Sequence, residues 1–187
     1  PGFARTGDAF WGFARHGIVP DVITTGKPMG NGIPVSGLLA KGDVLAAFSD
    51  QIPYFNTFGG NPVSMAAAQA VLKVIQEEEL QAHSKKVGAL LQAELAKLMD
   101  KHECVGDVRG AGLFIGFELV TDRHSKQPNK ALALNLIEEL RNTHRVLTSV
   151  AGPYGNVLKL RPPLAFQEKD IDWLVGALDQ SLTALKA

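Results

Sequence analysis

Residues 19–32 read VPDVITTGKPMGNG, and the order of residue types in this stretch guides the interpretation of the whole chain. Its first seven residues are rich in β-branched side chains and are bounded by proline and glycine, which predicts a buried strand over residues 19–25. Lys27 follows the carboxyl end of that strand and lies among glycines. Because ligands gather at the carboxyl ends of strands in α/β folds, we ask what this lysine binds.

Strand and helix signals alternate after this stretch. A second apolar run covers residues 35–40, and a short helix is predicted over residues 43–48. Asn61 and Pro62 are the residue types of a helix N-cap and of a first helical position, so the next helix is expected to start there. Valines and alanines recur along it at helical spacing, which predicts a buried, closely packed helix. The alternation is typical of an α/β layer.

From residue 80 onward the pattern changes. An amphipathic helix carries one apolar face, formed by Leu80, Val87, Leu90, Leu91, Leu95 and Leu98. Residues 108–120 alternate between apolar and other side chains, which indicates a strand with one buried face. A helix is predicted over residues 130–142, strands over 145–150 and 156–161, and a final amphipathic helix from about Ile171. This part has the pattern of a small α+β unit.

Composition excludes several classes of partner. The 187 residues are 45% hydrophobic, and 19 basic residues balance 19 acidic ones, so nothing favours nucleic acid or an anionic membrane as a partner. No apolar stretch approaches the roughly 20 residues of a transmembrane helix. The histidines and the single Cys104 lack the spacing of metal ligands, so no metal site is predicted. A lone cysteine suits a reducing compartment, and we expect a cytoplasmic protein.

Three roles for Lys27 can be compared from its neighbours. A P-loop needs a glycine where this chain has Asp21 and a serine or threonine where it has Pro28, so that role is excluded. The glycine pairs also lack the spacing of a dinucleotide fingerprint. A covalent catalyst needs a directed amine, and Pro28 disfavours a helical conformation at Lys27, which predicts an extended backbone that presents the side chain. The glycines at positions 26, 30 and 32 would let a planar ligand approach the backbone there. On these residues alone, a turn lysine remains the commoner interpretation.

Two other side chains are candidates for binding anions. Thr57 lies in a glycine-containing loop just before a helix N-terminus, where a hydroxyl can donate to phosphate. Arg161 ends a predicted strand before two prolines, where a guanidinium can bind a carboxylate through two parallel hydrogen bonds. On residue types alone, a loop threonine and a surface arginine are the commoner interpretations.

Five motifs, in this order, resemble the class III (omega) aminotransferases, which are fold-type I pyridoxal-phosphate enzymes. They are GFARTGDAFWGF, VPDVITTGKPMGNGIPV, YFNTFGGNPVS, VGDVRGAGLFIGFELV and LKLRPPL. The resemblance covers nearly the whole chain. It implies an α/β fold in which residues 1–79 are the end of the large cofactor-binding domain and residues 80–187 are a small α+β domain. The motifs are most similar to a branch with alanine-glyoxylate aminotransferase-like proteins and ethanolamine-phosphate phospho-lyases.

The resemblance implies a role for each candidate. Lys27 falls on the lysine that forms a Schiff base with pyridoxal 5'-phosphate and then moves a proton between substrate and cofactor. Thr57 falls on a threonine that contacts the cofactor phosphate of the neighbouring subunit, which implies a homodimer with shared active sites. Arg161 falls on an arginine that many members use to bind the substrate carboxylate.

The resemblance also leaves three functions open. The first is transfer of an amino group from an amine or amino acid to a keto acid, and the second is a phospho-lyase acting on a phosphorylated amine. In the family, the aspartate that pairs with the pyridine nitrogen and the segment that binds the phosphate lie upstream of the motif that begins at Gly2. We therefore expect this chain to be the carboxyl-terminal half of an enzyme, and the third possibility is an inactive fragment.

Overall fold

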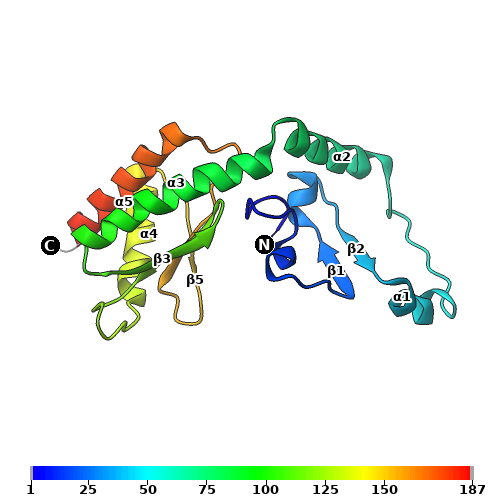
Figure 1. Ribbon diagram of the computed structural model, residues 1–187, viewed down its shortest axis with the longest axis horizontal. Coiled ribbons are helices and arrows are strands. Elements are labelled where there is room, and N and C mark those ends of the chain that lie inside the picture. The colour runs from blue at the N-terminus through cyan, green and yellow to red at the C-terminus, as the bar shows by residue number, and fades with distance from the viewer. Residues whose placement is uncertain (1, 186–187) are drawn as a thin grey trace.

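The structure, a computed structural model, describes residues 2–185. Its helices and strands form two groups, which Figure 1 shows toward opposite ends of an elongated molecule. The N-terminal group contains η1 (Gly12–His16), β1 (Val22–Thr25), η2 (Lys27–Gly30), β2 (Gly37–Ala40), α1 (Gly42–Ser49) and α2 (Pro62–Glu77). The C-terminal group contains α3 (Leu80–Lys101), β3 (Val105–Ala111), β4 (Phe114–Leu119), α4 (Lys130–His144), β5 (Val150–Ala151), β6 (Val157–Leu160), η3 (Glu168–Asp170) and α5 (Ile171–Leu185).

An antiparallel sheet with the strand order β3-β4-β6-β5 organises the C-terminal group. The predicted alternation is confirmed along β4, where Ile115, Phe117 and Leu119 are almost fully buried and the intervening residues are half-buried. These side chains pack with apolar residues of α3, α4 and α5 in one core. Residues 108–120 are not one strand, however. Gly112, with φ of +50°, allows a tight turn that divides the stretch between β3 and β4.

The N-terminal group has a much smaller core. β1 and β2 pair antiparallel, with Thr25 opposite Gly37. The predicted start of α2 is confirmed, because the Asn61 side chain accepts a hydrogen bond of 2.9 Å from the backbone N–H of Ser64. The prediction that α2 is buried is wrong for this chain. Val63 is 71% exposed, because only one face of the helix packs against neighbouring elements.

The two groups have separate apolar clusters. The larger lies within the C-terminal group, and the smaller contains Phe3, Ala4 and Ile75 as its buried members. Leu80 and Leu164 of the C-terminal group pack against this smaller cluster. Division of the chain into a domain of residues 1–79 and one of residues 80–187 stays a prediction, and the separate clusters support it.

A junction of closely packed backbone joins the groups. It consists of the segment before η1, the N-terminal half of α3, and the β3–β4 turn. A Cβ atom on Gly88 of α3 would lie 2.2 Å from the backbone of Gly112, and one on Gly112 would lie 2.4 Å from the carbonyl oxygen of Arg5. The Ser84 hydroxyl donates to that same oxygen at 2.5 Å. The junction therefore holds the segment around Arg5 against the C-terminal group.

Candidate functional site

Lys27 lies where β1 turns into η2. Backbone hydrogen bonds from Met29 to Gly26 (3.1 Å) and from Asn31 to Pro28 (3.4 Å) wind the chain into a 3-10 turn directly after the strand. The extended backbone predicted at Lys27 is therefore wrong, since its φ is +36°. Proline disfavours the right-handed helical region at the residue before it and favours an extended one, but the positive φ places Lys27 in the left-handed region. Such a conformation is costly for a residue other than glycine and is concentrated at functional sites.

Glycines near Lys27 have a different use from the one predicted. We expected Gly26, Gly30 and Gly32 to leave room for a planar ligand against the backbone. A Cβ atom on Gly30 would instead lie 2.8 Å from the Val35 side chain, so its absence lets the turn pack on the chain itself. Gly32 has φ of +113° and open space at its Cβ position. Of the three, Gly32 alone has open space at its Cβ position.

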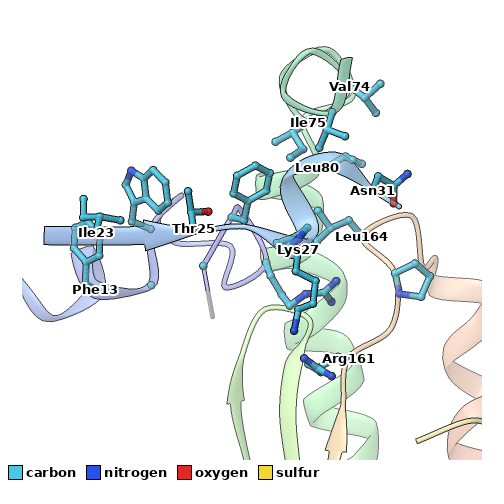
Figure 2. A pocket seen from close by; sticks show the side chains of 18 of the residues that line it. Phe13, Ile23, Thr25, Lys27, Asn31, Val74, Ile75, Leu80, Arg161 and Leu164 are labelled. Atoms are coloured by element: carbon cyan, nitrogen blue, oxygen red, sulfur yellow. The ribbon is translucent and has the colours of Figure 1, made fainter. Parts of the chain in front are cut away.

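Lys27 and Arg161 line one cavity of about 1130 Å³. Figure 2 shows the Lys27 side chain reaching from the ribbon of the N-terminal group toward Arg161, which lies just beyond the end of β6. Both side chains are exposed to solvent. The structure thus brings together two of the three residues that the sequence singled out, although they lie in different groups of elements.

Aromatic and aliphatic side chains form most of the cavity wall. Trp11 and Phe13 are stacked with their ring centroids 6.0 Å apart, and Ile23 and Val74 line the same space. Apolar walls limit hydration and strengthen the electrostatic interactions of any charged group nearby. The cavity is therefore suited to a planar ring that also carries charge.

The charged residues around the cavity are of one sign. Arg5, Lys27 and Arg161 contribute cationic side chains, and none of the described residues that line it is an aspartate or a glutamate. Within residues 2–185, no acidic side chain forms an ion pair with Arg161. A guanidinium without a protein counterion is available to an external anion. The donor set fits an anionic ligand such as a carboxylate or a phosphate.

Arg5 was not identified as a site residue from the sequence. It is half-buried, and its Nη1 donates hydrogen bonds to the carbonyl oxygens of Leu113 (3.0 Å) and Pro162 (2.5 Å). Burial lowers the pKa of Arg5, and the positive charge of Arg161 lowers it further. The available signal was an arginine inside the first Gly- and aromatic-rich motif, but its partners lie too far along the chain for local patterns to reveal them.

Thr57 does not line the cavity that Lys27 and Arg161 share. It is exposed, in a loop whose turn is formed by the Asn56 side chain, which accepts from the backbone N–H groups of Phe58 (3.2 Å) and Gly59 (3.0 Å). This loop borders a second, open cavity of about 880 Å³, which Lys27 also lines. Thr57 itself is not among the described residues that line either cavity. That Thr57 contacts the cofactor phosphate of the neighbouring subunit remains a prediction.

Comparison with known proteins identifies the family. The family model for Aminotransferase class-III matches residues 1–182. Ethanolamine-phosphate phospho-lyase homolog 1 of Caenorhabditis elegans is 45% identical over 98% of this chain and 40% of its own length. Alanine--glyoxylate aminotransferase 2 homolog 2, mitochondrial, of Arabidopsis thaliana is 44% identical over 98% of this chain and 38% of its own length.

A solved structure supports the same assignment. A phospholyase from Arthrobacter in complex with phosphoethanolamine superposes with a TM-score of 0.92 and 41% sequence identity, covering 98% of this chain and 43% of that one. The chain thus spans about 40% of the length of the curated relatives it matches. No helix within residues 2–185 is both long enough and apolar enough to cross a membrane.

These matches confirm the fold-type I assignment and the cofactor. The structural neighbours are transaminases and related enzymes of this fold, and the family works with pyridoxal phosphate. The exposed amine of Lys27 beside an apolar wall, in a cavity whose lining carries cationic but no acidic side chains, fits such a group. The chain belongs to the class III aminotransferase family.

Proposed function

We propose that this chain supplies the reacting lysine and the carboxylate-binding arginine of an aminotransferase that moves an amino group from an amine or amino acid to a keto acid. One observation carries the proposal. Lys27 and Arg161 come from different groups of elements, yet they line the same cavity, whose wall is apolar and whose charges are all cationic. Small-molecule amines and keto acids are the substrates of the family.

Lys27 would hold the cofactor through its Nζ atom. Pyridoxal phosphate, when bound, supplies an aldehyde that takes up the substrate amine and a ring that withdraws electrons from the reacting carbon. The Nζ atom of Lys27, when it is not bonded to the cofactor, would be a free amine that can accept a proton from the substrate carbon and return it. The strained backbone at Lys27 supports this role, because it aims the side chain into the cavity.

Arg161 would orient the substrate. Its planar guanidinium can bind a carboxylate through two parallel hydrogen bonds, which fixes both the position and the rotation of the substrate. The absence of an acidic partner among the described residues supports this role, since no internal ion pair must be broken first. The stacked Trp11 and Phe13 would exclude water from the same space.

Thr57 would act in a neighbouring subunit. Its hydroxyl is exposed and lies outside the cavity that Lys27 and Arg161 share, so it is accessible to a partner subunit. The surrounding loop also exposes large apolar side chains, with Phe55 at 85% and Phe58 at 79%. Both observations support a homodimer in which Thr57 binds the cofactor phosphate of the partner's site.

The alternative is a phospho-lyase, which eliminates phosphate from a phosphorylated amine. It is supported by the phospholyase relatives and by the cationic cavity, because a phosphate can replace a carboxylate at Arg161. The two reactions differ in their requirements. Elimination releases inorganic phosphate and needs no acceptor, whereas transamination needs a keto acid such as pyruvate or glyoxylate.

The experiment has two stages. In the first, the 187-residue chain is incubated with pyridoxal phosphate and reduced with borohydride, and the modified residue is located by mass spectrometry. We expect modification at Lys27, loss of it in Lys27→Ala, and normal modification in Lys41→Ala, a matched surface lysine that is paired with Asp21 at 2.6 Å. Modification spread over surface lysines and unchanged by Lys27→Ala would contradict the role of Lys27 and favour the inactive-fragment alternative.

The second stage separates the two reactions, using the protein as its gene encodes it. One assay follows transamination of pyruvate or glyoxylate, and the other follows phosphate release from phosphoethanolamine without an acceptor. We expect transamination. Phosphate release without an acceptor, together with no transamination, would instead establish the phospho-lyase.

Cytoplasmic location is also a proposal. A single cysteine supports a reducing compartment, whereas the Arabidopsis relative carries the word mitochondrial in its name. Fractionation of cells that express the gene, with antibody detection, is expected to find the protein in the cytosolic fraction. Recovery with mitochondria would refute it.

A further inference from the structure

Arg5 connects the first segment of the chain to the residue that follows Arg161. Its Nη1 donates to the carbonyl oxygen of Pro162 at 2.5 Å and to that of Leu113 at 3.0 Å. Pro162 is covalently bonded to Arg161, so the guanidinium of Arg5 holds the backbone that carries the second arginine. A hydrogen bond from a charged donor is stronger than one between neutral groups, which makes this a firm attachment.

The backbone of Arg5 is also held in place. Its carbonyl oxygen accepts hydrogen bonds from the Ser84 hydroxyl (2.5 Å) and from the Leu113 backbone N–H (3.1 Å). Gly112 packs so closely on the same oxygen that no side chain fits there. Arg5 cannot move without moving α3 or the β3–β4 turn. It is thus a rigid support and not a mobile surface cation.

The two guanidinium groups repel each other. The charge of Arg161 lowers the pKa of Arg5, after the larger effect of burial. No ion pair with an acidic side chain is found for either arginine among residues 2–185. Because Arg5 is fixed by two carbonyl groups while Arg161 is exposed, an anion that binds Arg161 relieves the repulsion.

We infer that Arg5 is a positioning residue for the substrate anion: it fixes the backbone that carries Arg161 and raises the anion affinity of that arginine. The inference rests on the proposed role of Arg161 as the anion-binding group. Arg5 acts through Arg161, so the effects of removing the two side chains are not additive.

Anion binding can be measured directly by fluorescence. The chain has two tryptophans: Trp11 lines the cavity, and Trp173 lies on α5 and is 54% exposed. In a Trp173→Phe background, Trp11 reports binding of propionate, a carboxylate without an amine, titrated at constant ionic strength. Because this assay uses no cofactor and no turnover, its outcome is independent of the tests of the proposed reaction.

The variants are Arg5→Gln, Arg161→Gln, their combination, and the control Arg15→Gln, whose side chain pairs with Asp8 at 2.7 Å outside the cavity. Loss of a charged hydrogen-bonding group predicts that Arg5→Gln and Arg161→Gln each weaken propionate binding about tenfold or more. The combination is expected to be no weaker than Arg161→Gln alone, and the control to be unchanged.

Two results would overturn the inference. One is unchanged propionate affinity in Arg5→Gln. The other concerns the double variant. If adding Arg5→Gln to Arg161→Gln weakens propionate binding by the same factor as Arg5→Gln does in the parent, Arg5 acts independently of Arg161. Thermal unfolding checks that each variant is folded. If Arg5→Gln does not fold, Arg5→Lys replaces it, because lysine retains the charge but not the planar donor geometry. An affinity in Arg5→Lys equal to that of the parent would equally refute positioning by the guanidinium.

Discussion

Replacing Gly88 by alanine tests the junction that supports the site. A Cβ atom there would lie 2.2 Å from the backbone carbonyl group of Gly112, whereas ordinary contacts begin at 3.4 Å. The Cβ atom is fixed to the backbone of α3 and its partner is main chain, so neither can rotate away. Helix α3 must therefore move about 1.2 Å from the β3–β4 turn to restore ordinary contact.

The effect of this movement on the free energy of unfolding is the sum of three contributions. Overpacking against backbone costs about 3 kcal/mol, the upper end of the usual range. The hydrogen bond from the Leu113 N–H to the Ser84 hydroxyl, 3.1 Å long and buried, would be stretched beyond hydrogen-bonding range at a cost of about 1 kcal/mol. Alanine is the better helix former by about 1 kcal/mol. The net expectation is a loss of about 3 kcal/mol in the free energy of unfolding.

Urea denaturation followed by circular dichroism measures the loss. With a slope of about 2 kcal/mol per molar, the midpoint is expected to fall by about 1.5 M. Gly176→Ala is the matched control, because Gly176 lies within α5 and a Cβ atom there meets nothing within 4 Å. That variant should gain about 0.5–1 kcal/mol. A neutral or stabilised Gly88→Ala, or losses of equal size in both variants, would refute the close-packing argument.

Two other predictions concern stability. Hydrogen bonds hold the pKa of Asp179 below its usual range, and the bond from Lys101 has a larger effect than the one from His102. The stabilisation that these bonds give the fold is therefore complete at neutral pH and is lost as the pH falls through the lowered pKa. Asp179→Asn is therefore expected to destabilise the chain by about 1–3 kcal/mol at pH 7, with the difference closing below about pH 4 in urea titrations, and a pH-independent difference would contradict this. Asn61→Ala removes the N-cap of α2 and should cost about 1 kcal/mol by thermal unfolding, whereas Asn61→Ser, which keeps an acceptor, should cost much less.

Each of the two groups of elements contributes one residue to the proposed chemistry. The N-terminal group presents Lys27 on a strained turn, and the C-terminal group presents Arg161 at the end of β6. Correct spacing between the two side chains depends on how the groups are held together. The junction around Arg5 is the feature that links this spacing to the packing of α3.

The sequence by itself determined the helices and strands whose signals are local. The cap at Asn61 predicted the start of α2, and alternation predicted the buried face of β4, because both patterns follow from the geometry of neighbouring residues. The family resemblance singled out Lys27 and Arg161, and family membership is confirmed. Local rules failed at Lys27, where proline predicted an extended backbone, because the hydrogen-bonded 3-10 turn of η2 overrides that preference and gives Lys27 a positive φ.

Only the tertiary structure decided which residues meet. Arg5 and Pro162 lie 157 residues apart along the chain, and no local pattern encodes a hydrogen bond between them. The same holds for Gly88 and Gly112. The need for glycine at these positions arises only because α3 packs directly on the β3–β4 turn. The exposed face of α2 likewise could not be predicted from its apolar spacing, since spacing shows which residues share a face but not whether another element covers it.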